Sequence, residues 1–174
     1  MTAVLAILVA AISPGIDVKA QSLADKALCS NPNHLAKTCS AIARYTISPN
    51  GSARETTELL IAPTQHVTLE MSATASIDGN SVCGSLSMLD LEAGIVRING
   101  ERLPKDRHAA ALGRLVEALK PMVGRRTCDA LQIVDGQLLK FGQVDGVEIK
   151  LPGKPVAWIA KDAGYTVVPA PTTQ

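Results

Sequence analysis

Aromatic side chains are scarce in this sequence of 174 residues. One Trp, one Phe and two Tyr make up 2% of the chain. Proteins that bind single-stranded nucleic acid usually stack the bases on aromatic side chains, and the net charge of +1 gives no general attraction to phosphate groups. We therefore expect no nucleic-acid partner. The hydrophobic core has to be largely aliphatic, because hydrophobic residues still account for 47% of the chain.

Catalytic and metal-binding motifs are also missing. The sequence contains no G-x-S-x-G, no S-x-x-K and no H-E-x-x-H, which are signatures of nucleophiles and zinc sites. The histidines, His34, His66 and His108, have no metal-ligand spacing, and His66 has the polar parity of an alternating strand, so we expect it to face solvent. We expect no metal and no cofactor. The sequence therefore favours a non-catalytic protein. An enzyme whose site is assembled from residues distant in sequence is an alternative.

Four cysteines, Cys29, Cys39, Cys83 and Cys128, are present. Their spacing lacks the close C-x2-C pairs typical of zinc sites. Thiols pair in oxidising compartments, so the cysteines predict two disulfides. We favour Cys29–Cys39, because the pair is local, and Cys83–Cys128, because it brackets one supersecondary unit.

The N-terminus resembles a secretory signal. Residues 3–12 are uninterruptedly apolar, Ser13-Pro14-Gly15 ends the run, and Val18-Lys19-Ala20 places small or modest residues before a cut near Ala20. The run is too short to cross a bilayer as a helix. Met1-Thr2 lacks the usual basic residue, and a buried N-terminal helix is the alternative. We expect a cleaved signal peptide over residues 1–20, one domain over 21–168, a flexible tail over 169–174, and a secreted or periplasmic protein.

One strong amphipathic helix is predicted, from Lys105 to Lys120. Its apolar stripe recurs at helical spacing, and Pro121 ends it. The stripe consists of Leu112, Leu115, Val116 and Leu119. We expect this stripe to cover one face of a sheet.

The rest of the chain predicts helices first and strands afterwards. Residues 21–45 have apolar residues at helical spacing around an Asn31-Pro32-Asn33 turn, so they predict a short helical hairpin. Beyond Tyr45, alternating segments separated by Asn-Gly and Asp-Gly turns predict hairpins. The predicted fold class is α+β: an antiparallel sheet of about six to nine strands, one main helix packed on it, and the N-terminal helical hairpin.

Charge is unevenly distributed along the chain. Residues 54–92 contain one basic and six acidic residues, whereas residues 97–126 contain eight basic and three acidic ones. If the two segments pair, these charges mean little beyond solubility. If they lie apart, a basic surface could meet an anionic partner. The candidate contact residues are Arg107, Arg114, Arg125 and Arg126.

These patterns favour an exported, disulfide-stabilised domain of non-catalytic binding type. Its partner would be a protein or an anionic component of the cell envelope. The first alternative is a carrier of a small apolar ligand between helix and sheet, with Leu112, Leu115 and Val116 in the pocket wall. The second is an enzyme. A pocket, a cleft with paired titratable groups, or a flat arginine-rich surface would distinguish the three.

Overall fold

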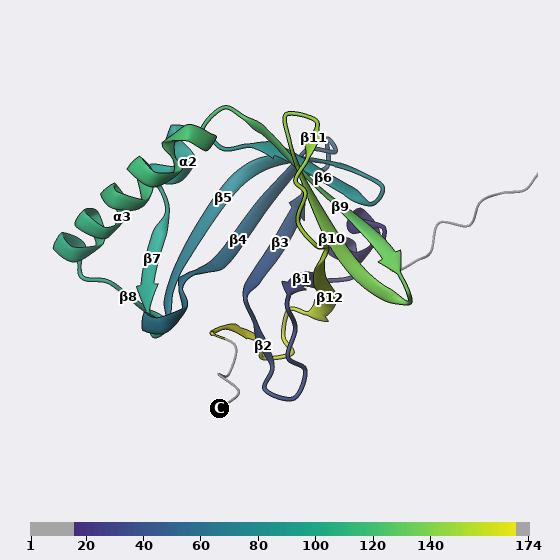
Figure 1. Cartoon of the computed structure of the whole chain (residues 1–174), viewed down its shortest axis with the longest axis horizontal. Helices are drawn as coiled ribbons and strands as arrows, with labels where there is room; N and C mark the ends of the chain where they lie inside the picture. The colour runs from purple at the N-terminus through teal and green to yellow at the C-terminus, as the bar shows by residue number, and fades with distance from the viewer. Residues whose placement is uncertain (1–15, 170–174) are drawn as a thin grey trace, which may run out of the picture.

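The computed structural model describes residues 16–169, which form a closed barrel of eight antiparallel strands with additional elements (Figure 1). Each barrel strand pairs with the next one along the chain, and the last pairs with the first, so the sheet has no open edge within the barrel. In chain order the barrel strands are β1 (Lys26–Ser30), β3 (Ala41–Ile47), β4 (Ala53–Ala62), β5 (Val67–Asp78), β6 (Ser81–Ser85), β9 (Arg126–Val134), β10 (Gln137–Val144) and β12 (Lys154–Ala160).

One insertion separates β6 from β9. Its strand β7 pairs with the first half of β5, beyond the end of β6, and thereby extends the sheet past the barrel. The inserted elements are α2 (Met88–Glu92), β7 (Ile95–Ile98), β8 (Glu101–Arg102), α3 (Lys105–Leu119) and η2 (Lys120–Met122). The remaining short elements are α1 (Val18–Leu23), β2 (Thr38–Cys39), η1 (Pro63–Gln65), β11 (Val147–Glu148) and β13 (Thr166–Val167).

The prediction of an open sheet covered by one main helix is wrong. The helix exists over nearly the predicted residues, but no residue of α3 is buried, and its apolar stripe is only half-buried. In Figure 1, α3 lies to one side of the barrel, beyond β7 and β8. The sheet instead covers its own apolar face by curling until β1 meets β12. That pairing joins opposite ends of the chain, which local periodicity does not reveal.

The predicted N-terminal helical hairpin is also wrong. Only α1 is helical; it ends before Asp25, which has a φ of 57° in the left-handed region, and β1 begins one residue later. Strand β1 lies between β3 and β12, where Leu28 is opposite both Ala43 and Trp158. Pairing on both sides outweighs the weak helical preference of this segment, because propensity is a small free-energy term beside burial.

Two apolar clusters stabilise the fold. The first fills one part of the barrel interior and includes Leu28, Tyr45, Leu131 and Val156, together with Val18 of α1, which is fully buried. The second lies on the outer face of β1 and β3, where β2 and β13 form a two-stranded parallel sheet beside it. The outer cluster shows that both faces of the barrel wall are covered at this point.

The structure contains two disulfides, Cys29–Cys39 and Cys83–Cys128, which are the pairs favoured from the sequence. Cys29–Cys39 is buried in the outer cluster. Cys83 and Cys128 lie directly opposite each other on β6 and β9, with their Cα atoms 4.0 Å apart. This second bond therefore joins the two ends of the insertion that contains α3.

The predicted signal peptide lies partly outside the described residues. Its apolar run, residues 3–12, is not covered, and neither is most of the predicted tail. Val18, on the N-terminal side of the predicted cut, belongs to the interior core, and its N–H donates to the carbonyl of Gly79. Residues 16–169 include no helix with the length and apolarity needed to cross a bilayer.

Candidate functional site

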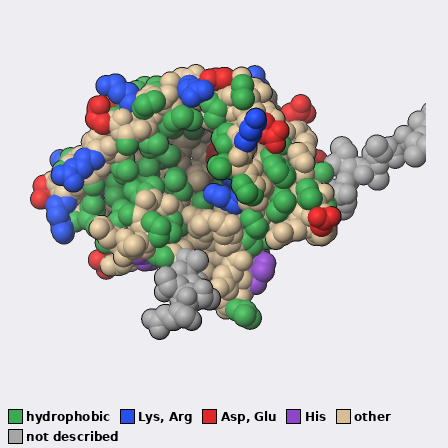
Figure 2. Space-filling model, in the orientation of Figure 1, with side chains coloured by type: hydrophobic (Ala, Val, Ile, Leu, Met, Phe, Trp, Pro, Cys, Tyr) green, Lys and Arg blue, Asp and Glu red, His purple; other side chains and the backbone are tan. Residues whose placement is uncertain are grey.

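A cavity of about 420 Å³ opens into the barrel. Figure 2 shows it as a hollow near the centre of one face, surrounded mainly by hydrophobic side chains. Its walls come from β4, β5, β6, β9 and β10, and from the segments around α3 and β11. The residues that line the cavity include Glu55, Thr57, Met71, Ala73, Ala75, Val82, Gly84, Leu119, Met122, Asp129, Lys140, Gly142 and Ile149.

The interior is hollow because small residues occupy several inward-facing positions. Ala73 and Ala75 on β5, Gly84 on β6 and Gly142 on β10 all line the cavity. An eight-stranded barrel is just wide enough either to be filled by large side chains or to hold one small ligand. At this end the side chains are too small to fill the barrel, whereas Tyr45, Leu131 and Val156 fill the other part.

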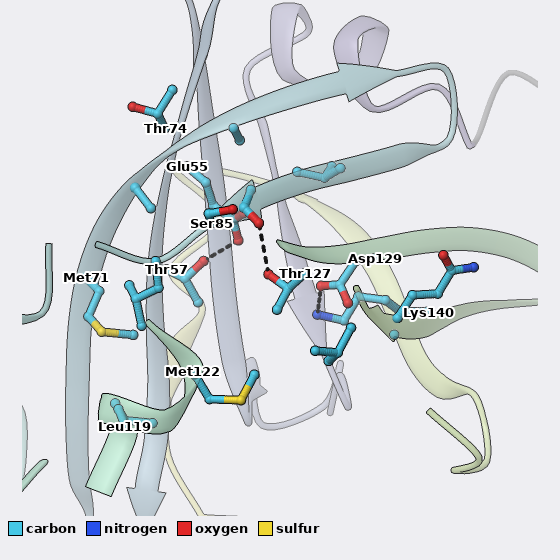
Figure 3. Close-up of a pocket in the computed structure, with 18 of the residues that line it drawn as sticks. Glu55, Thr57, Met71, Thr74, Ser85, Leu119, Met122, Thr127, Asp129 and Lys140 are labelled. Carbon is cyan, nitrogen blue, oxygen red and sulfur yellow. Dashed lines mark hydrogen bonds and ion pairs between the residues drawn. The ribbon is translucent and has the colours of Figure 1, made fainter. Parts of the chain in front are cut away.

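The end of α3 and the turn that follows form one wall of the cavity. Leu119 and Met122 reach it from this side, and Met71 lies on β5 nearby (Figure 3). The predicted carrier pocket named Leu112, Leu115 and Val116, none of which lines the cavity. The contribution of the helix is therefore confined to its C-terminal end.

Glu55 is the carboxylate on the β4 wall. It is partly buried, and its Oε1 accepts a hydrogen bond of 2.6 Å from the Thr57 hydroxyl. Burial raises the pKa of Glu55 above the ordinary value of 4.5, and the charge of Asp129 raises it further. The hydrogen bond from Thr57 and the charge of Lys140 act in the opposite direction without cancelling the rise. The site thus holds a carboxylate in an environment that penalises its charge.

Asp129 and Lys140 form an ion pair across β9 and β10. Lys140 Nζ lies 2.7 Å from Asp129 Oδ2, and both side chains line the cavity. Figure 3 shows this pair on the side of the cavity opposite Met71. The opposite charges of the two groups largely neutralise each other. The pair therefore presents a dipole at the cavity wall instead of a net charge.

Tyr45 lies behind the charged wall. It is opposite Glu55 in the β3–β4 register and is 4% exposed. Burial raises the pKa of its hydroxyl well above 10.0, and the charges of Glu55 and Asp129 raise it further. Its ring packs edge-on against Trp158 with the ring centroids 6.3 Å apart. Tyr45 belongs to the interior core, and Trp158 packs against that core.

The four arginines predicted as a contact surface do not line the cavity. Arg107 and Arg114 are exposed on α3, and Arg126 is exposed at the start of β9. Arg125 is also exposed, and its Nε lies 2.8 Å from Oδ2 of Asp145. A partner-binding role for these arginines stays a prediction.

The acidic and basic segments meet at one described ion pair. Arg97 Nη1 lies 3.2 Å from Glu70 Oε2 where β5 pairs with β7. The pair Lys120–Glu117 is local to the end of α3. The two segments are thus neighbours in the fold, but only a small part of their charge is paired within residues 16–169.

The histidines have structural contacts. His66, expected on a solvent-facing strand position, instead ends η1 with a φ of 46° and is half-buried, with its Nε2 2.9 Å from the Val167 carbonyl. His108 Nε2 accepts from the Val96 N–H at 3.2 Å, which fixes α3 to β7. His34 Nδ1 lies 2.7 Å from the Tyr165 hydroxyl. Residues 16–169 contain no group of three or more His, Cys, Asp or Glu arranged to hold a metal.

No sequence motif predicted a role for the three charged residues of the cavity, Glu55, Asp129 and Lys140. Glu55 entered only a count of charges, and Asp129 and Lys140 were assigned no role. One signal was present: Ala53, Glu55, Thr57 and Leu59 share one face of β4. A carboxylate at an inward position could have been suspected once the inner face was known.

No protein-family model matches the chain, and no curated protein or solved structure shows significant similarity to it.

Proposed function

We propose that this disulfide-stabilised domain binds a small amphipathic molecule in the barrel cavity. The observation that carries the proposal is the cavity itself: about 420 Å³, open to solvent, mostly apolar, with a few polar groups gathered on one wall. Sites for small molecules in proteins have this size and composition. Glu55, Asp129 and Lys140 would orient the polar end of the ligand, and Met71, Leu119 and Met122 would contact its apolar body.

The cavity favours a small ligand over the protein or envelope partner that the sequence placed first. The arginines proposed for such a partner lie on α3 and near β9, and one of them is engaged by Asp145. The two disulfides favour a protein that functions outside the reducing cytosol, because disulfides persist in oxidising compartments. We therefore infer a secreted or periplasmic binding protein whose ligand enters the barrel beside the end of α3.

An enzyme is the second candidate, and Glu55 is the observation that favours it. A carboxyl group with a raised pKa inside a cavity is suited to proton transfer. The neighbouring Asp129–Lys140 pair would then orient the substrate. The two functions differ in one measurable respect, because a binding protein releases its ligand unchanged and an enzyme converts it.

The proposal is tested by titration with N-phenyl-1-naphthylamine, an apolar fluorescent probe. We expect saturable binding with a blue shift in emission. Ala73 lies opposite Glu55 on the cavity wall, so Ala73→Phe should fill the cavity and weaken binding at least about tenfold. The matched control is Ala110→Phe, on the exposed surface of α3. Equal binding by both variants would contradict a site in the barrel.

A further inference from the structure

The charged residues of the cavity wall indicate which chemical class of ligand the cavity favours. Three ionisable residues line the cavity: Glu55, Asp129 and Lys140. With all three ionised, two negative charges and one positive charge leave a net charge of −1. A ligand that enters with an apolar body and a cationic group would neutralise this excess, whereas an anionic ligand would increase it.

The excess negative charge is located on Glu55. Asp129 and Lys140 are already paired at 2.7 Å. Glu55 accepts from Thr57, a neutral donor, and no Lys, Arg or His of residues 16–169 forms an ion pair with it. A partly buried carboxylate without a cationic partner lacks the interaction that usually accompanies burial of a charge.

The groups around Glu55 come from the neighbouring barrel strands and from the far side of the cavity. Tyr45 lies opposite it on β3, and Ala73 lies opposite it on β5. Asp129 on β9 and Lys140 on β10 are the charged groups near enough to influence it. Ala73 has only a methyl side chain, so the space beside the carboxylate belongs to the cavity.

We propose that the ligand is a hydrophobic amine, whose ammonium group pairs with the Glu55 carboxylate while its hydrocarbon body lies against Met71, Leu119 and Met122. This inference rests on the proposed binding function and names the ligand class for the same cavity. The Thr57 hydroxyl holds one carboxylate oxygen. The ammonium donates to the carboxylate and remains fully protonated, so no covalent step is involved.

Binding of this kind depends on pH in a defined direction. The ammonium pairs with the ionised form of Glu55, so affinity falls as pH falls through the raised pKa of that carboxyl. Tyr45 stays neutral over this range, because its pKa is raised well above 10.0. A ligand with a hydroxyl in place of the amine would show a much weaker dependence.

The test compares three probes of equal chain length: decylamine, decanol and decanoate, titrated by isothermal calorimetry at neutral pH and at mildly acidic pH. Decylamine should bind at least about tenfold more tightly than the other two, as expected for a charge-assisted hydrogen bond in a partly buried site. Glu55→Gln should abolish both the preference for decylamine over decanol and the pH dependence of decylamine binding. Glu101→Gln removes the same charge from the exposed strand β8 and should change nothing.

Each alternative outcome overturns a specific claim. If decanol or decanoate binds as tightly as decylamine, the cavity binds ligands but the amine assignment is wrong. If Glu55→Gln keeps the preference for decylamine, Glu55 is not the recognition group and the assignment is again wrong. If none of the three probes binds, the proposed binding function fails together with the inference.

Discussion

Glu55 and Tyr45 lie directly opposite each other on β4 and β3, so a carboxylate and a buried phenol share the inner wall of the barrel. Burial raises the pKa of both groups, and the charge of Glu55 raises the pKa of Tyr45 further. A fold selected for stability alone would gain by placing an apolar residue at position 55. A carboxylate that is kept at a position where it lowers the stability of the fold is typical of a functional site.

Replacing Glu55 with Gln should stabilise the ligand-free protein at neutral pH. A carboxyl group whose folded-state pKa is raised contributes stability below its unfolded-state pKa and loses it as pH rises through the folded-state value. The melting temperature of Glu55→Gln should therefore exceed that of the wild type at neutral pH, and the difference should vanish below about pH 4. Differential scanning calorimetry against pH measures this. A difference that is constant with pH would exclude the ionisation of Glu55 as its cause.

Removing the Cys83–Cys128 disulfide should cost about 4 kcal/mol of unfolding free energy on the chain-entropy model, since it closes the long loop that contains α3. Cys29 and Cys39 are only 10 positions apart, and by the same argument their bond contributes about 3 kcal/mol. The double variants Cys83→Ala/Cys128→Ala and Cys29→Ala/Cys39→Ala, compared in denaturant melts, test both values. A larger loss from the shorter loop would show that burial in the outer cluster matters more than loop length.

Val18→Ala should cost about 2 kcal/mol, because the side chain is fully buried in the interior core. Val147→Ala, at a position that is 70% exposed, should change stability by less than about 0.5 kcal/mol.

The same comparison bears on the predicted cut near Ala20. A chain that starts at Gln21 lacks Val18 and should melt at a lower temperature than one that starts at Ile16. Equal melting temperatures would show that α1 is dispensable.

The helix α3 should be less important for stability than its apolar stripe predicts. Leu115 is half-buried, whereas Leu131 inside the barrel is 1% exposed. We expect Leu131→Ala to cost about 2–5 kcal/mol and Leu115→Ala about 1 kcal/mol. Arg114→Ala, on the exposed face, should cost less than about 0.5 kcal/mol. If denaturant melts show that Leu115→Ala lowers the free energy of unfolding as much as Leu131→Ala, the apolar stripe of α3 contributes to the core as the sequence predicted.

Local features of the fold were predictable from the sequence because they depend on neighbouring residues. The helix from Lys105 ends one residue earlier than expected. The turns at Asn99-Gly100, Asp135-Gly136 and Asp145-Gly146 all have positive φ at both positions, as two-residue hairpin turns require. The presence of disulfide bonds is likewise confirmed.

Closure of the barrel was not predictable in the same way. It depends on the pairing of β1 with β12, which lie far apart in the chain, and on β1 being a strand at all. Leu23, Ala27 and Leu28 have helical spacing, so the sequence favoured a helix there. The cavity exists only because the barrel is closed. Glu55, Asp129 and Lys140 come together in it because β4, β9 and β10 belong to one barrel.

The most direct test of the central claim observes the cavity wall while a ligand binds. The chain has four methionines, and two of them, Met71 and Met122, line the cavity from β5 and η2, whereas Met88 lies on α2 and does not line it. Titration of methyl-labelled protein with decylamine, followed by NMR, should shift the methyl signals of Met71 and Met122 saturably and leave that of Met88 in place. Unchanged signals from Met71 and Met122, or an equal shift of Met88, would contradict binding in the barrel.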